Sequence, residues 1–97
     1  MTYVSTAVPY LYPNIYTDNI DDYLLVYNPL SEKGVTVLNR EARFIFSQID
    51  NKRTLGDIVA LAKKEDPKIR FRHINRIFKD FFSAEVIYFD SPKLKVK

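Results

Sequence analysis

The chain has 97 residues, with 15 Lys and Arg against 12 Asp and Glu, a net charge of +3 and no cysteine. This length fits one domain, and the lack of cysteine excludes disulfides, thiolate catalysis and cysteine-ligated zinc or iron–sulfur sites. One histidine, His73, gives too few ligands for a His-based metal site. The chain has only two glycines, Gly34 and Gly56, and they are too few and too far apart to form a glycine-rich phosphate-binding loop. We therefore expect a non-catalytic domain without a cofactor.

The apolar runs are too short to cross a bilayer, and residues 1–8 lack the charged and apolar regions of a signal peptide. We therefore expect a cytoplasmic protein with no membrane partner. The positive net charge favours an acidic partner, although the chain lacks the dense basic runs of many nucleic-acid-binding arms.

The first part of the chain predicts an arm and a small sheet. Residues 1–13, which contain Pro9 and Pro13, are expected to form an irregular N-terminal arm, because X-Pro steps interrupt regular pairing. Residues 18–22 predict a polar turn, and residues 28–34 contain the Pro, Ser and Gly typical of a chain reversal. Extended, apolar or β-branched runs predict strands at 14–17, 23–27 and 35–38. Together they would form an antiparallel meander.

Three helices are expected next, over about 39–49, from Thr54 through Ala62, and over 70–83. Asn39 can cap the first, and its predicted buried residues are Ala42, Ile45, Phe46 and Ile49. Asn51 can take the left-handed conformation after that helix. Thr54 and Asp57 resemble a capping box for the second helix, and Asp66-Pro67 fits the start of the third. The predicted buried face of the second helix contains Ile58, Val59, Leu61 and Ala62.

The third helix is amphipathic with a basic outer face. Its apolar arc contains Phe71, Ile74, Ile77, Phe78, Phe81 and Phe82, and the opposite side carries Arg72, Asn75, Arg76 and Lys79. The basic side fits an ordinary solvated surface, a DNA-recognition helix, or one wall of a groove for an acidic peptide. Charge alone does not choose among these three interpretations.

Strands grouped before helices predict an α+β domain, in which a three-stranded antiparallel sheet is followed by a three-helix bundle in a winged helix-turn-helix-like arrangement. The domain would occupy residues 14–89. The apolar run at 86–89 predicts a short strand or a packed tail, and the lysine-rich residues 90–97 predict a polar tail or linker.

Four short motifs occur in order within VTVLNREARFIFSQIDNKRTLGDIV, residues 35–59. They are a strand ending in Leu38-Asn39, a helix ending at Asp50-Asn51, then Thr54-Leu55 and Asp57-Ile58. With the later INRIFKDFFSAEVI segment, they make residues 23–87 resemble the PqqD-like family of RiPP precursor peptide recognition elements. Asn51 stands where that family usually has glycine, and Glu85 stands near a second such position.

The resemblance implies that a leader peptide adds an antiparallel strand to the edge of the third strand and packs against the third helix. The domain would bind the precursor without catalysis and present it to a modifying enzyme, either separate or fused, such as a radical SAM maturase. The implied strand-pairing residues are Val35, Thr36, Val37 and Leu38. Apolar leader residues would meet Ile74, Ile77 and Phe78, and acidic ones would meet Arg72, Arg76 and Lys79.

Two other functions fit the sequence. A winged-helix DNA-binding domain would use Arg70, Arg72, Arg76 and Lys79 on its recognition helix, and its binding would depend steeply on salt. A small protein-interaction subunit would pair its open strand edge with a partner chain or with itself. A leader-binding domain differs from both in preferring one small peptide, so nucleic acid is not its expected partner.

Overall fold

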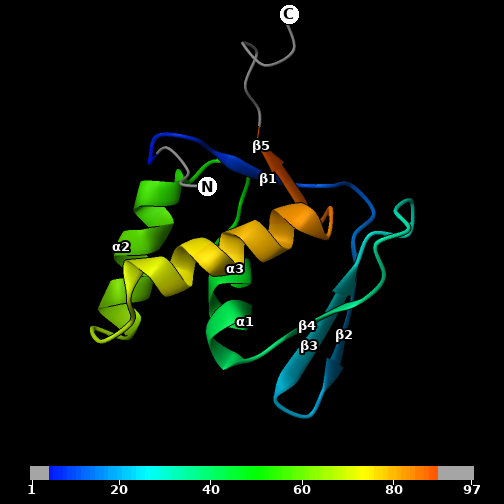
Figure 1. Ribbon diagram of the computed structural model, residues 1–97, viewed down its shortest axis with the longest axis horizontal. Helices are drawn as coiled ribbons and strands as arrows, with labels where there is room; N and C mark the ends of the chain where they lie inside the picture. Colours follow the sequence, from blue (N-terminus) through cyan, green and yellow to red (C-terminus); the bar gives the residue numbers. More distant parts are fainter. Residues whose placement is uncertain (1–4, 90–97) are drawn as a thin grey trace, which may run out of the picture.

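The computed structural model describes residues 5–89, which form an α+β domain with a three-stranded antiparallel sheet followed by three helices (Figure 1). The expected fold class is thereby confirmed. The tail or linker expected at 90–97 lies outside the described residues. In chain order the elements are β1 (Pro9–Leu11), β2 (Tyr16–Ile20), β3 (Tyr23–Tyr27), β4 (Thr36–Leu38), α1 (Arg40–Ser47), α2 (Leu55–Glu65), α3 (Phe71–Ser83) and β5 (Ile87–Phe89).

The strands β2, β3 and β4 lie side by side in that order and are antiparallel. Ile20 pairs with Tyr23, so the β2–β3 turn contains only two residues, and the first of them, Asp21, has a φ of 54°. The expected strand at 14–17 is therefore displaced to β2, and the expected turn at 18–22 is too long. Polar residues are compatible with β2 because the whole strand is exposed.

The sheet buries one face. Along β3, Leu24 and Val26 are buried, and in the antiparallel register they pair with Leu38 and Thr36 of β4. Side chains alternate across a strand, so Leu25 and Val37, which pair with each other, lie on the opposite, outer face.

The N-terminal arm is not irregular as expected, because β1 pairs with β5 in a second, two-stranded antiparallel sheet. Pro9 pairs with Phe89 at the start of β1, where a proline is tolerated in an edge strand. The rings of Tyr10 and Tyr88 stack with centroids 5.5 Å apart. The amide of Leu55 also donates to the carbonyl of Ala7 at 2.8 Å, so the arm is tied to the start of α2.

The helices begin and end largely through local side-chain bonds. The side chain of Asn39 accepts from the amide of Ala42 at 3.0 Å, as expected for the N-cap of α1, which ends at Ser47 rather than Ile49. Thr54 and Asp57 form the expected capping box of α2. Asp66-Pro67 does not start the third helix, because Asp66 caps the C-terminus of α2.

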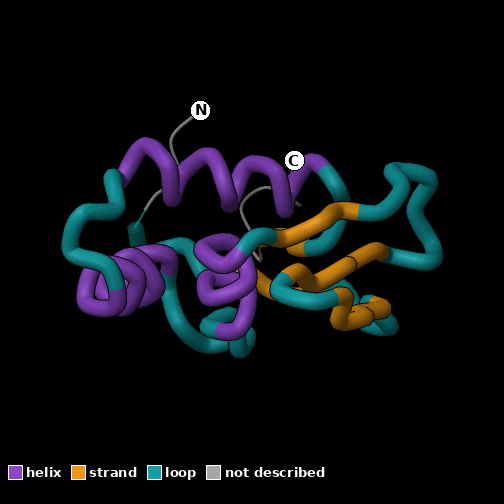
Figure 2. The backbone as a smooth tube through the Cα atoms, turned by 90° about the horizontal axis from the view of Figure 1, so that it is seen from below, coloured by secondary structure: helices purple, strands orange, loops and turns teal. Residues whose placement is uncertain are grey.

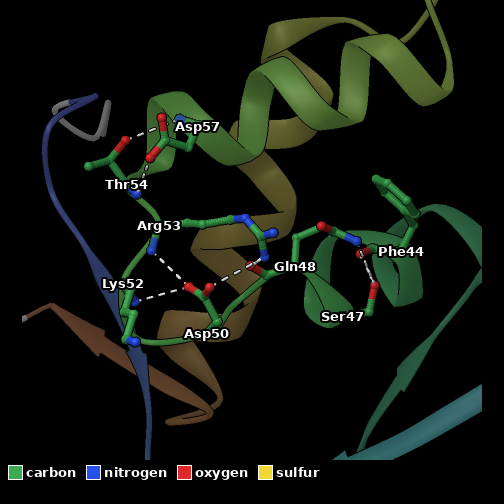
Figure 3. Close-up of polar contacts among 8 residues, drawn as sticks. All are labelled: Phe44, Ser47, Gln48, Asp50, Lys52, Arg53, Thr54 and Asp57. Atoms are coloured by element: carbon green, nitrogen blue, oxygen red, sulfur yellow. Dashed lines mark hydrogen bonds and ion pairs between the residues drawn. The ribbon is translucent and has the colours of Figure 1, made fainter.

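Asp50 organises the turn between α1 and α2 (Figure 3). Its carboxylate accepts from the amides of Lys52 at 3.0 Å and Arg53 at 2.8 Å, and it lies 3.4 Å from the Arg53 guanidinium. These bonds favour the ionised form, and the Arg53 amide has the largest effect, so the pKa of Asp50 lies below its ordinary value of 3.8. Asn51 has a φ of 64°, the left-handed conformation expected after the helix.

The helix α3 lies along one side of the molecule, over α1, α2 and the strands (Figure 2). Its residues Ile74, Ile77, Phe78 and Phe81 are buried, whereas Phe71 and Phe82 at the ends of the expected apolar arc are 47% and 43% exposed. Of the expected core residues, Ile45, Ile49, Ile58 and Ala62 are buried. Within residues 5–89, no helix combines the length and apolar character that a membrane span requires.

Candidate functional site

The strand β4 has an unpaired edge. One side of β4 pairs with β3, and within the described part of the chain no strand pairs with the other side. The strand Thr36–Leu38 contains no proline and no charge, which are the usual devices that prevent an edge from pairing. Leu38 is 2% exposed and anchors β4 in the core, whereas Val37 is 57% exposed on the outer face. Backbone donors and acceptors are therefore available on a strand that is itself held in place.

A groove of about 200 Å³ lies between β4 and α3. Leu38, Ile77 and Phe81 form its apolar floor, and Tyr23 and Asn39 lie at the end of β4. The groove is lined by Tyr23, Thr36, Val37, Leu38, Asn39, Ala42, His73, Arg76, Ile77, Asp80 and Phe81. It therefore combines a free strand edge with an apolar surface.

The rim of the groove carries charges of both signs. Nε2 of His73 lies 2.7 Å from Oε1 of Glu41, which links α3 to α1. Arg76 lies about one turn and Asp80 about two turns further along α3, and both are exposed. A positive and a negative group are therefore both available to polar side chains of a bound ligand.

The basic side of α3 forms a shallow depression of about 370 Å³, here called the outer depression. It is lined by Arg72, Asn75, Arg76, Lys79 and Asp80. Arg76 and Asp80 also line the groove, so the two surfaces are continuous.

The structure brings five of the predicted site residues together in the groove: Thr36, Val37, Leu38, Arg76 and Ile77. Val35 precedes β4 and is 55% exposed. Arg72 and Lys79 line only the outer depression. Of the three basic residues expected to line the groove, only Arg76 does so.

Ile74 and Phe78 do not line the groove, which corrects their predicted role. They are 0% and 2% exposed and line a small apolar cavity with Leu55 and Val59 of α2. Helical geometry explains the division, because side chains four residues apart lie on the same stripe. The stripe of Ile74 and Phe78 faces α2, and the stripe of Ile77 and Phe81 faces β4.

Six residues of the groove were not among the predicted site residues: Tyr23, Asn39, Ala42, His73, Asp80 and Phe81. His73 and Phe81 could have been predicted, because each lies four residues from Ile77 and therefore on the same stripe of the helix. Tyr23 had no such signal, because its place beside Asn39 depends on the pairing of β3 with β4.

No protein-family model matches the chain, and the searches of curated proteins and of solved structures found no similar protein. Among residues 5–89, no group of three or more His, Asp or Glu side chains is placed to hold a metal ion.

Proposed function

We propose that this domain binds the leader region of a ribosomally synthesised precursor peptide as an added strand on β4, and presents it to a peptide-modifying enzyme without catalysing a reaction itself. The observation that carries the proposal is the unpaired, uncharged edge of β4 beside an apolar groove. Main-chain hydrogen bonds to such an edge supply affinity, and the side-chain pockets beside it select the partner.

The two edges of the sheet differ in a way that favours β4. The other edge strand, β2, carries Asp18 at its centre and is exposed along its whole length. A charge in an edge strand disfavours pairing with another chain. Figure 1 places β2 on the side of the hairpin away from the helices, whereas β4 has α3 beside it. A peptide on β4 would therefore gain side-chain contacts as well as backbone bonds.

Two backbone conformations support the family resemblance. Asn51 and Glu85 have φ values of 64° and 60°, in the left-handed region that favours glycine. These are the positions at or near which the resembled family usually has glycine. Both residues therefore adopt a conformation that suits glycine, the residue type that the resembled family has at or near these positions.

Titration calorimetry with peptides selected from a display library of random sequences tests the proposal. Charge reversal at Arg76 should weaken binding about threefold to tenfold, because Arg76 lines the groove and is solvent-exposed. Charge reversal at Lys79 should have a smaller effect, since Lys79 lines only the outer depression. The matched control is Lys64→Glu on α2, which should leave affinity unchanged. Equal affinities for Arg76→Glu and Lys64→Glu, or a library without binders, would contradict the proposal.

DNA binding remains a second candidate because Arg72, Arg76 and Lys79 share the outer depression on the exposed side of α3. A DNA complex made through these side chains would weaken steeply with salt and would be disrupted by Arg72→Glu. A leader peptide in the groove should tolerate Arg72→Glu. Fluorescence anisotropy with a labelled random-sequence duplex, measured over a range of salt concentrations, separates the two functions.

A further inference from the structure

A second depression continues the groove past the end of β4. It has a volume of about 430 Å³ and is lined by Asp22, Tyr23, Asn39, Arg40 and Arg43, and it is here called the arginine depression. Tyr23 and Asn39 line both the groove and the arginine depression, so the two surfaces meet at these residues. A chain lying along β4 would pass directly from one to the other.

The arginine depression has an excess of positive charge. Among the described residues, neither Arg40 nor Arg43 takes part in an ion pair. The guanidinium of Arg43 donates to the neutral side-chain oxygen of Asn19, and Asp22 is the one acidic residue in the lining. The lining therefore contains two cations and one carboxylate, which favours a negatively charged ligand group, and Arg40 is the cation next to the end of β4.

The geometry of strand addition determines which peptide residue reaches this charge. Along an added strand, alternate side chains point toward α3, and the others lie on the outer face with Val37. The outward residue beside Val37 would cover a side chain that is 57% exposed. The next outward residue toward Asn39 lies about 6.6 Å further along the strand, at the border with the arginine depression.

We propose that the arginine depression is a second anchoring site for the same peptide, and that it takes an acidic side chain. The inference rests on the proposed function and specifies its substrate class. The preferred segment has the pattern acidic–x–apolar, with the apolar residue on Val37 and the acidic residue facing Arg40, which directly follows Asn39. In an antiparallel addition the acidic residue comes first, because the N-terminal part of the peptide then lies at the Asn39 end of β4.

The test is a pair of selections from the same random-peptide library, one on the unmodified domain and one on Arg40→Gln. Arg40 is exposed and lies in the first turn of α1, so its replacement should leave the fold intact. Peptides selected on the unmodified domain should be enriched in the acidic–x–apolar pattern, and the acidic preference should fall on Arg40→Gln. Lys64→Gln removes the same charge from α2 and should keep the preference.

A double-mutant cycle, measured by binding titrations, then tests whether the acidic peptide residue contacts Arg40. Replacing the acidic residue of a selected peptide by its amide should weaken binding to the unmodified domain about twofold to fivefold, and should weaken binding to Arg40→Gln much less. Equal losses on both domains, or no acidic enrichment, would overturn this inference. In that case a loss of affinity in Arg76→Glu would still support peptide binding in the groove. A library without binders would overturn both proposals.

Discussion

Asp50 shows how one exposed carboxylate can organise a connection between helices. Two backbone amides donate to it, and the Arg53 guanidinium both pairs with it and donates to the carbonyl of Gln48 at 3.2 Å. Because these bonds are stronger with the ionised form, the pKa of Asp50 is lowered, mainly through the Arg53 amide. The turn should therefore contribute to stability in a pH-dependent way.

The sign of that dependence follows from the lowered pKa. The contribution of Asp50 to the free energy of unfolding is complete when the pH is above the ordinary carboxyl pKa of 3.8. It is lost as the pH falls through the lower pKa of the folded state. Asp50→Asn should unfold at a lower temperature than the unmodified protein at neutral pH, and this gap should close in strong acid. Thermal unfolding followed by circular dichroism across this range measures it. A gap that is the same at neutral and acidic pH would refute the assignment.

Glu85 combines an unfavourable backbone conformation with useful contacts. Its amide donates to Phe82 and that of Val86 donates to Phe81, which is the Schellman pattern that ends α3 with a left-handed residue. Its carboxylate accepts from the hydroxyl of Ser31, and its carbonyl accepts from the buried Asn28 side chain at 2.9 Å. Glu85 thus ties the end of α3 to the loop that leads into β4.

Comparing Glu85→Gly with Glu85→Ala separates the backbone cost from these contacts. Both variants lose the Ser31 bond, but only alanine keeps the steric cost of the left-handed conformation. Glu85→Gly should therefore be more stable than Glu85→Ala by about 0.5–1 kcal/mol in urea unfolding. If Glu85→Ala proved more stable than Glu85→Gly, the assignment of a left-handed backbone conformation to residue 85 would be refuted.

At the scale of the elements, the capping box of α2 supports a second quantitative prediction. The Thr54 hydroxyl accepts from the Asp57 amide at 3.1 Å, and the Asp57 carboxylate accepts from the Thr54 amide at 3.0 Å. Thr54→Ala should cost about 1 kcal/mol in urea unfolding. The double variant with Asp57→Ala should cost less than the sum of the single changes, because the two bonds support the same turn. Strict additivity would contradict this coupling.

Features that depend on neighbouring residues were predictable from the sequence. The N-cap at Asn39, the capping box at Thr54 and the left-handed Asn51 each follow from a few adjacent side chains. The same holds for most of α3, whose apolar spacing is local, and for the run at 23–27 that forms β3. These features were sufficient to predict an α+β domain.

Features that depend on distant residues were not predictable in this way. The pairing of Pro9 with Phe89 joins the two ends of the described chain, and no nearby residue signals it. The apolar arc of α3 predicted burial, but not that Ile74 faces α2 while Ile77 faces β4. The arginine depression likewise depends on packing, since it joins the β2–β3 turn at Asp22 with the start of α1.

At the scale of the whole molecule, three connected surfaces surround the free edge of β4. The apolar groove meets the outer depression at Arg76 and Asp80, and it meets the arginine depression at Tyr23 and Asn39. Cations therefore flank an apolar centre on both sides. This arrangement suits an extended chain with apolar residues and flanking acidic ones, and it leaves the backbone of β4 available to hold that chain.

Amide hydrogen exchange, read by NMR with and without a library-selected peptide, tests the use of the β4 edge most directly. Strand addition should slow exchange within Thr36–Leu38 and shift the resonances of His73 and Ile77, because a new backbone ladder would cover the edge and the groove. The amides of β2 should be unaffected. Unchanged exchange in β4 with a saturating peptide, or protection confined to β2, would contradict the proposed mode of binding.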